Sequence, residues 1–160
     1  MTLAVLGLGS NLGDSRQIVL DAMDALEGIL TNLRRASLYD TAPLYVSDQG
    51  RFVNSAVSGF FPGREDIAAA RKLLAEINTI ERQFGRDRSK ERRWGERYLD
   101  IDILLFGELV VREADLYIPH QRLNERRFAL EPLLELFPEA AEPGTGLFYK
   151  DLCRALPEPG

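Results

Sequence analysis

The stretch YLDIDILLF (Tyr98–Phe106) decides the fold of this chain, and Gly107 closes it. Its Ile and Leu content predicts a buried strand. Side chains alternate between the faces of a strand, so Asp100 and Asp102 project to one side, roughly 6–7 Å apart. Two carboxylates on one face repel each other unless a cation lies between them. Hard oxygen ligands at this spacing suit Mg²⁺. The alternative is the solvated outer face of an antiparallel sheet.

The segment before this strand, RDRSKERRWGER (Arg86–Arg97), carries six basic and three acidic side chains in a chain of net charge -5. Basic residues next to paired carboxylates are typical of a metal–polyphosphate site, because acids bind the cation and bases neutralise phosphate oxygens. Trp94 and Gly95 suggest a loop that covers a planar or anionic ligand. The alternative is a surface loop of screened ion pairs, each of little energetic value.

Composition limits the function classes. The chain has 160 residues, 45% hydrophobic and 28% charged, which predicts a single domain over 1–160 with a sizeable core. No apolar run is long enough to span a membrane, and the run Leu3–Leu8 is too short for a secretory signal.

Cys153 is the one cysteine, which fits a reducing cytoplasm and, with one histidine, excludes a His/Cys zinc site. The pI near 5.0 argues against broad nucleic-acid binding. Nothing in the composition demands an assembly, so we expect a monomer.

Hydrophobic periodicity predicts an α+β fold. We expect strands over 3–8, 34–40, 52–61 and 98–106, and helices over 15–30, 67–84 and 130–137. Residues 108–111 could pair with the aspartate strand as a short hairpin, a short helix follows His120, and the 138–160 tail is mostly irregular. The order βαββαβ is the ferredoxin-like pattern, with an antiparallel sheet, helices on one face and a C-terminal helical extension available for the other.

Glu81 lies beside the apolar stripe of the 67–84 helix, near the negative end of its dipole. It could form a salt bridge with an arginine of the following loop, or contact a ligand beneath that loop. Both interpretations remain open from the sequence.

Two rival functions deserve comparison. Gly7-x-Gly9-x-x-x-Gly13 follows a strand and precedes a helix, but the spacing is wrong for dinucleotide binding and no acidic residue follows at the required distance. A ferredoxin-like sheet could also bind single-stranded RNA. Asp100 and Asp102 would then face its phosphates, which is electrostatically unfavourable without a metal.

The chain resembles the 6-hydroxymethyl-7,8-dihydropterin pyrophosphokinase family of folate biosynthesis. The matching motifs are GSNLG (9–13), YxTxPL (39–44), FVNSAV (52–57), GRxR (85–88), RWGxRxLDIDILLFG (93–107), Pro119-His120, Arg126 and Phe128. This family transfers the β,γ-pyrophosphate of ATP to the hydroxymethyl group of the pterin and releases AMP. The resemblance therefore implies ATP and 6-hydroxymethyl-7,8-dihydropterin as substrates.

The resemblance also implies residue roles. Asp100 and Asp102 would hold two Mg²⁺ ions, with Asp102 assisting loss of the substrate hydroxyl proton. Arg86 and Arg97 would clamp the phosphates. The implied pterin-binding residues are Thr41, Ala42, Leu44, Phe52, Asn54, Trp94 and Phe128. The implied ATP-binding residues are Asn78, Glu81, Arg88, Trp94, Ile103, His120 and Arg126. The chain departs from common family residues at Phe52, Tyr117 and Gln121. A non-catalytic ferredoxin-like binding domain is the remaining alternative, and it would bind its ligand without Mg²⁺.

Overall fold

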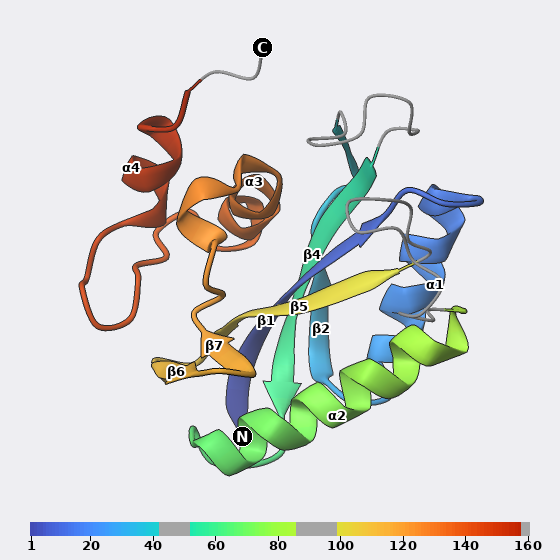
Figure 1. The fold of residues 1–160 in the computed structure, drawn as a ribbon, viewed down its shortest axis with the longest axis horizontal. Coiled ribbons are helices and arrows are strands. Elements are labelled where there is room, and N and C mark those ends of the chain that lie inside the picture. Colours follow the sequence, from blue (N-terminus) through green and yellow to red (C-terminus); the bar gives the residue numbers. More distant parts are fainter. Residues whose placement is uncertain (42–51, 86–98, 158–160) are drawn as a thin grey trace.

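The computed structural model describes residues 1–41, 52–85 and 99–157 (Figure 1). Its elements, in chain order, are β1 (Thr2–Ser10), α1 (Ser15–Leu26), β2 (Thr31–Arg35), β3 (Tyr39–Thr41), β4 (Phe52–Phe61), α2 (Ile67–Gln83), β5 (Asp100–Phe106), β6 (Val111–Glu113), β7 (Leu116–Ile118), the 3₁₀ turn η1 (Leu123–Glu125), α3 (Arg127–Leu136) and α4 (Tyr149–Arg154). No helix in these ranges combines the length and the apolar character needed to cross a bilayer.

The main sheet has the strand order β2-β4-β1-β5, and β3 continues the β2 side along β4. Every pairing in it is antiparallel. Each βαβ unit is split by an intervening strand, since β4 lies between β1 and β2, and β1 lies between β4 and β5. This arrangement confirms the predicted ferredoxin-like α+β fold.

Local signals explain the two sheet-packed helices. Asp14 caps α1 by accepting a hydrogen bond from the Gln17 backbone N–H at 3.3 Å, and Asp66 caps α2 through the Ala69 N–H at 2.9 Å. Gly85 follows α2 with φ 83°, the left-handed conformation that a C-terminal glycine supplies. The predicted boundaries of α2 are therefore nearly right. The prediction that α1 continues to residue 30 is wrong, because the chain turns after Leu26.

Two predicted strand features are also wrong. The strand expected over 34–40 is two strands, β2 and β3, separated at residues 36–38. The Ser37 N–H there donates to the Glu135 carboxylate rather than to a neighbouring strand. Residues 108–111 do not pair with β5; Val111 begins a separate β6–β7 hairpin. Gly107, at φ 56°, turns the chain away from the sheet before that hairpin begins.

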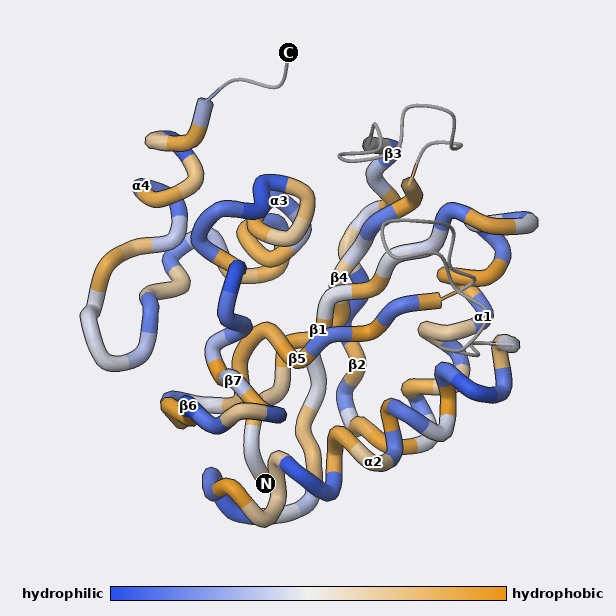
Figure 2. Tube along the Cα trace, viewed as in Figure 1, coloured by the Kyte–Doolittle hydropathy of each residue, from blue (hydrophilic) through white to orange (hydrophobic). Residues whose placement is uncertain are grey.

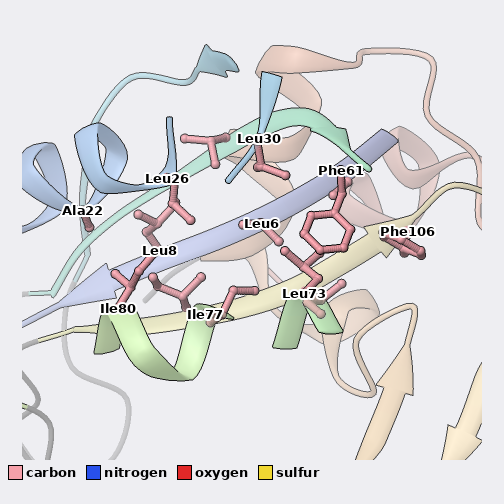
Figure 3. Packing of buried hydrophobic residues seen from close by; sticks show 14 of the residues in the cluster. Leu6, Leu8, Ala22, Leu26, Leu30, Phe61, Leu73, Ile77, Ile80 and Phe106 are labelled. Carbon is pink, nitrogen blue, oxygen red and sulfur yellow. The ribbon is translucent and has the colours of Figure 1, made fainter. Parts of the chain in front are cut away.

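The larger hydrophobic cluster lies between the sheet and α1 and α2. Alternate residues of β1, such as Leu6 and Leu8, are buried there, and Figure 3 shows Leu73, Ile77 and Ile80 of α2 directed at them. Figure 2 shows the matching pattern on α2, hydrophobic along the side that meets the sheet and hydrophilic elsewhere. Burial of this stripe holds α2 on the sheet, and Val19, Ala22, Met23 and Leu26 of α1 are buried in the same cluster, so both helices lie on one face.

The opposite face of the sheet carries α3, and α4 packs against α3 (Figure 1). Val5 of β1 and Leu105 of β5 belong to this second cluster, together with Leu130, Leu133 and Tyr149. The C-terminal helices thus cover the face that the first two helices leave open. The C-terminal helices leave the polar start of β5 partly exposed on this face.

Candidate active site

The paired aspartates lie where the strand pattern predicts. Ile101 and Ile103 are buried in the cluster facing α1 and α2, whereas Asp100 and Asp102 are half-buried and project from the opposite face. Figure 2 shows this alternation of hydrophilic and hydrophobic residues at the start of β5. The end of β5 is apolar on both faces because it lies under α3 and α4.

Glycines on the adjacent strand leave space next to the aspartates. Gly9 is paired with Asp100, and Gly7 with Asp102. A Cβ on Gly9 would lie 2.8 Å from the Asn54 Oδ1 atom, closer than side chains tolerate. Gly9 therefore allows the buried Asn54 side chain to lie across β1. The dinucleotide-binding alternative loses its basis, because Gly7 and Gly9 belong to the extended strand β1 rather than to a phosphate-binding turn.

His120 is placed beside Asp102 by a break in the β5 pairing. The register between β1 and β5 shifts at Val5/Leu6, so Leu104 is an extra residue. The Leu104 carbonyl accepts a hydrogen bond from the His120 N–H at 3.1 Å. The His120 Nε2 atom then lies 3.8 Å from the Asp102 Oδ1 atom. The chain reaches this position directly after the cis Ile118–Pro119 peptide.

The surroundings of the His120 ring favour its neutral form. Its Nδ1 atom accepts a hydrogen bond from the Arg122 N–H at 3.2 Å, so the proton of the neutral ring is on Nε2, on the side of Asp102. Burial lowers the pKa of His120, and the positive charges of Arg126 and Arg122 lower it further, against the opposite effect of Asp100. His120 can therefore donate a hydrogen bond without carrying a charge.

Arg126 and Phe128 enter the site at the start of α3. Arg126 occupies the N-cap position, and its guanidinium carbon lies 5.5 Å from the centre of the Phe128 ring. A cation placed over an aromatic face at this distance is attracted to the ring. The positive charge of Arg126 also lowers the pKa of His120, so the two side chains share this part of the site.

Glu81 approaches the aspartate strand from the α2 side. Its carboxylate is buried and accepts a hydrogen bond at 2.8 Å from the Ile101 N–H, between the two aspartates. β5 is an edge strand in the described sheet, so this N–H points away from β1. Neither interpretation of Glu81 from the sequence included this contact, since residue type gives no sign of a main-chain partner. Asn78 is half-buried on the same helix.

Several other predicted site residues lie at the same end of the sheet. Asn54 is buried and Phe52 half-buried on β4, and Thr41 at the end of β3 is paired with Phe52. The Ile103 side chain instead packs in the cluster facing α1 and α2. The predicted residues outside the described part of the chain are Ala42, Leu44, Arg86, Arg88, Trp94 and Arg97.

The donor chemistry at Asp100 and Asp102 fits magnesium. Both are oxygen ligands, both retain some exposure, and the facing glycines add no side chain to the space beside them. Within residues 1–41, 52–85 and 99–157, no group of three or more His, Cys, Asp or Glu side chains could hold a metal. Mg²⁺ commonly takes one or two carboxylates and completes its shell with water and phosphate oxygens.

Comparison with known proteins agrees with this geometry. Residues 5–138 match the family described as 7,8-dihydro-6-hydroxymethylpterin-pyrophosphokinase (HPPK). The chain belongs to this family. It is 35% identical over 159 residues to the 2-amino-4-hydroxy-6-hydroxymethyldihydropteridine pyrophosphokinase of Aquifex aeolicus, covering 99% of this chain and 92% of that protein.

Longer proteins share the same region. The chain is 39% identical over 149 residues to a mitochondrial folate synthesis bifunctional protein of Arabidopsis thaliana, covering 92% of this chain but 26% of that protein. The chain thus spans about a quarter of the length of this relative. Its fold matches a Plasmodium falciparum HPPK-DHPS structure with a TM-score of 0.71 at 16% identity, over 96% of this chain and 43% of that one. That match supports the fold alone.

Proposed function

We propose that this protein transfers pyrophosphate from ATP to the hydroxymethyl group of 6-hydroxymethyl-7,8-dihydropterin and releases AMP, a reaction of folate biosynthesis. The observation that carries the proposal is the position of Asp100 and Asp102 on an open sheet face, next to His120, in a chain of the HPPK family. Carboxylates that bind a cation next to donors for phosphate oxygens suit phosphoryl-group chemistry.

Asp100 and Asp102 would hold two Mg²⁺ ions. When bound, magnesium neutralises charge on the triphosphate and activates the attacking oxygen. The protein fixes both carboxylates on one strand, with the Ile101 N–H between them held by Glu81. In this proposal Asp102 also accepts the substrate hydroxyl proton, and the His120 Nε2 atom lies 3.8 Å from the same carboxylate.

The pterin would bind at the sheet end where β3, β4 and β1 meet. Asn54 supplies an amide that can both donate and accept hydrogen bonds, and Phe52 and Phe128 supply aromatic faces. Buried Asn54 is held in the space that Gly9 leaves. The remaining pterin-binding residues in the proposal are Thr41, Ala42, Leu44 and Trp94.

ATP would bind on the Asp102 and His120 side. His120 donates to the triphosphate, and Arg126 adds positive charge from the start of α3. Arg86 and Arg97 are proposed to clamp the phosphates and to offset transition-state charge. The further residues of the proposed nucleotide site are Asn78, Glu81, Arg88, Trp94 and Ile103.

We also propose that residues 1–160 form one domain, that the protein acts as a monomer and that it is cytoplasmic. A lone, buried Cys153 supports a reducing compartment. The name of the Arabidopsis relative places that protein in mitochondria. Fluorescence microscopy of this protein, tagged and expressed in its own cells, is therefore the measurement that decides the compartment.

The reaction is tested by mixing the protein with MgATP and 6-hydroxymethyl-7,8-dihydropterin. We expect AMP and the pterin diphosphate in equal amounts. Formation of ADP in place of AMP, or no consumption of either substrate, would overturn the assignment. Isothermal titration with and without a chelator adds a second criterion, because a non-catalytic binding domain would bind its ligand equally well in both conditions.

A further inference from the structure

The C-terminal end of α3 is joined to β3 by one carboxylate. Glu135 accepts a hydrogen bond from the Tyr39 hydroxyl at 2.6 Å through its Oε1 atom. It also accepts the Ser37 N–H at 3.1 and 3.0 Å and the Ser37 hydroxyl at 3.1 Å. Both carboxylate oxygens are thus used, and all the donors belong to the short segment that forms or precedes β3.

The electrostatics of this contact agree with its geometry. The Tyr39 hydrogen bond, together with the Ser37 donors, lowers the pKa of Glu135. Burial of the phenol and the Glu135 charge raise the pKa of Tyr39 to about 12. Glu135 is therefore an ionised acceptor for a protonated tyrosine, which is the stronger form of such a hydrogen bond.

The rest of the α3 end is anchored next to β2 and β4. The Arg34 guanidinium of β2 donates to the Leu136 carbonyl at 3.0 Å and lies 5.0 Å from the centre of the Phe137 ring. Leu136 packs with Ala36 and Ala56. Because this end of α3 is fixed by packing, Glu135 is a stationary acceptor for Ser37 and Tyr39.

Tyr39 connects this contact to Asn54. The two residues are directly opposite each other in the β3–β4 pairing, so their side chains project from the same face as neighbours. On the other side of Asn54 is Gly9, which has no side chain and approaches the Asn54 Oδ1 atom closely. The Asn54 amide is therefore positioned between Gly9 of β1, which has no side chain, and Tyr39 of β3.

We propose that Glu135 is a positioning residue for pterin recognition, which acts through Tyr39 to fix the Asn54 amide. This inference rests on the proposed function only in naming the pterin as the ligand that Asn54 contacts. Glu135 itself is exposed, and hydrogen bonds at an exposed site contribute little to global stability. Its removal should therefore leave the fold intact while the β3 position, and with it Asn54, becomes less well defined.

The experiment compares Glu135→Ala, Glu135→Gln and Tyr39→Phe with wild type. We expect Glu135→Ala to raise the KM and the Kd for the dihydropterin by roughly tenfold. The variant loses the charge-assisted hydrogen bonds of Glu135, which affect the pterin indirectly through Tyr39 and Asn54. The KM for ATP and kcat should stay within about twofold. Glu135→Gln keeps one acceptor oxygen and should show a smaller increase.

Tyr39→Phe should raise the pterin Kd less than Glu135→Ala, and the Tyr39→Phe/Glu135→Ala double variant should be no worse than Glu135→Ala alone. Glu139→Gln is the matched control. Glu139 is an exposed carboxylate shortly after α3, and its side chain is bound to Lys150 at 3.0 Å. Its variant should match wild type in every constant.

An equal loss of kcat and of affinity for both substrates in Glu135→Ala would show a merely structural role and overturn the proposal. Unchanged pterin affinity would also overturn it. The pterin Kd is measured by titration of the dihydropterin without ATP hydrolysis, so it reports on Glu135 independently of turnover. Absence of AMP from wild type with normal pterin binding would reject the reaction and leave this inference standing.

Discussion

The two faces of the central sheet are built from the same strands and serve opposite purposes. On the face covered by α1 and α2, alternate residues of β1 and β5 are apolar and buried. On the other face, at the start of β5, the same strands carry glycines and aspartates, and α3 covers only the apolar part. The covered face therefore stabilises the strands, and this allows the open face to hold repelling charges in fixed positions.

The division within β5 is made at Leu104. Before it, Asp100 and Asp102 face the open side; at and after it, Leu104 and Leu105 are buried beneath α3 and α4. The extra residue at this point also turns a carbonyl towards the His120 N–H. The same irregularity thus marks the end of the polar part of β5 and provides the carbonyl that binds His120 next to Asp102.

The largest effect is expected for Asp102→Ala on the open face. We expect turnover to fall on the order of 10³-fold or more, because the variant loses a carboxylate that binds charge in the transition state. The free energy of unfolding should change little, since the side chain is half-buried and outside both apolar clusters. Steady-state AMP formation and urea unfolding measure the two quantities. Asp115→Ala, which removes an exposed partner of Arg71, is the control with wild-type turnover. Near-normal turnover by Asp102→Ala would contradict the role of this face.

The reciprocal change is Leu6→Ala on the covered face. Leu6 is fully buried, so we expect a loss of about 2–5 kcal/mol in the free energy of unfolding from lost burial and the cavity that remains. At temperatures where the variant is folded, kcat should remain within a few-fold of wild type. Leu20→Ala, at an exposed position of α1, should cost less than about 1 kcal/mol. A Leu6 variant as stable as Leu20→Ala would show that the two faces are not distinct.

A smaller effect is expected for Gly9→Ala. The added Cβ would lie 2.8 Å from the Asn54 Oδ1 atom, so the amide must move. We expect pterin affinity to fall roughly tenfold, as for loss of a hydrogen bond in a buried site. Gly7→Ala is the comparison, because its Cβ would meet the flexible end of Leu104 at 3.3 Å and should affect pterin binding less. Equal pterin dissociation constants for both variants would argue against the position assigned to Asn54.

The smallest effect concerns the pH dependence of stability at Glu135. Its pKa in the folded protein is below the ordinary value of 4.5 because of the Tyr39 and Ser37 hydrogen bonds. A carboxylate with a lowered pKa stabilises the fold above its unfolded pKa, and this contribution is lost as the pH falls through the folded value. The difference in unfolding free energy between wild type and Glu135→Gln should be less than about 1 kcal/mol at pH 7. It should shrink below pH 4.5 in urea titrations, and a difference that grows on acidification would reverse the assigned sign.

Local sequence patterns were enough to predict the fold class, the α2 boundaries and the face from which Asp100 and Asp102 project. These follow from local chemistry, since strand alternation, helical periodicity and capping residues operate over a few neighbouring positions. The same reasoning failed at residues 36–38, where the Ser37 N–H is bound by Glu135 from 98 residues away.

The contacts between separate elements depend on the tertiary structure and could not be predicted from local patterns. The approach of Asn54 to Gly9, the contact of Glu81 with the Ile101 N–H and the position of His120 beside Asp102 each join residues from separate elements. Two of these contacts depend on main-chain groups: the Ile101 N–H that binds Glu81, and the Leu104 carbonyl that binds the His120 N–H. Main-chain N–H and carbonyl groups are the same in nearly every residue, so residue type does not predict such contacts. Strand order, register and the irregularity at Leu104 determine these contacts, because they determine which backbone N–H and carbonyl groups are not hydrogen-bonded to a neighbouring strand.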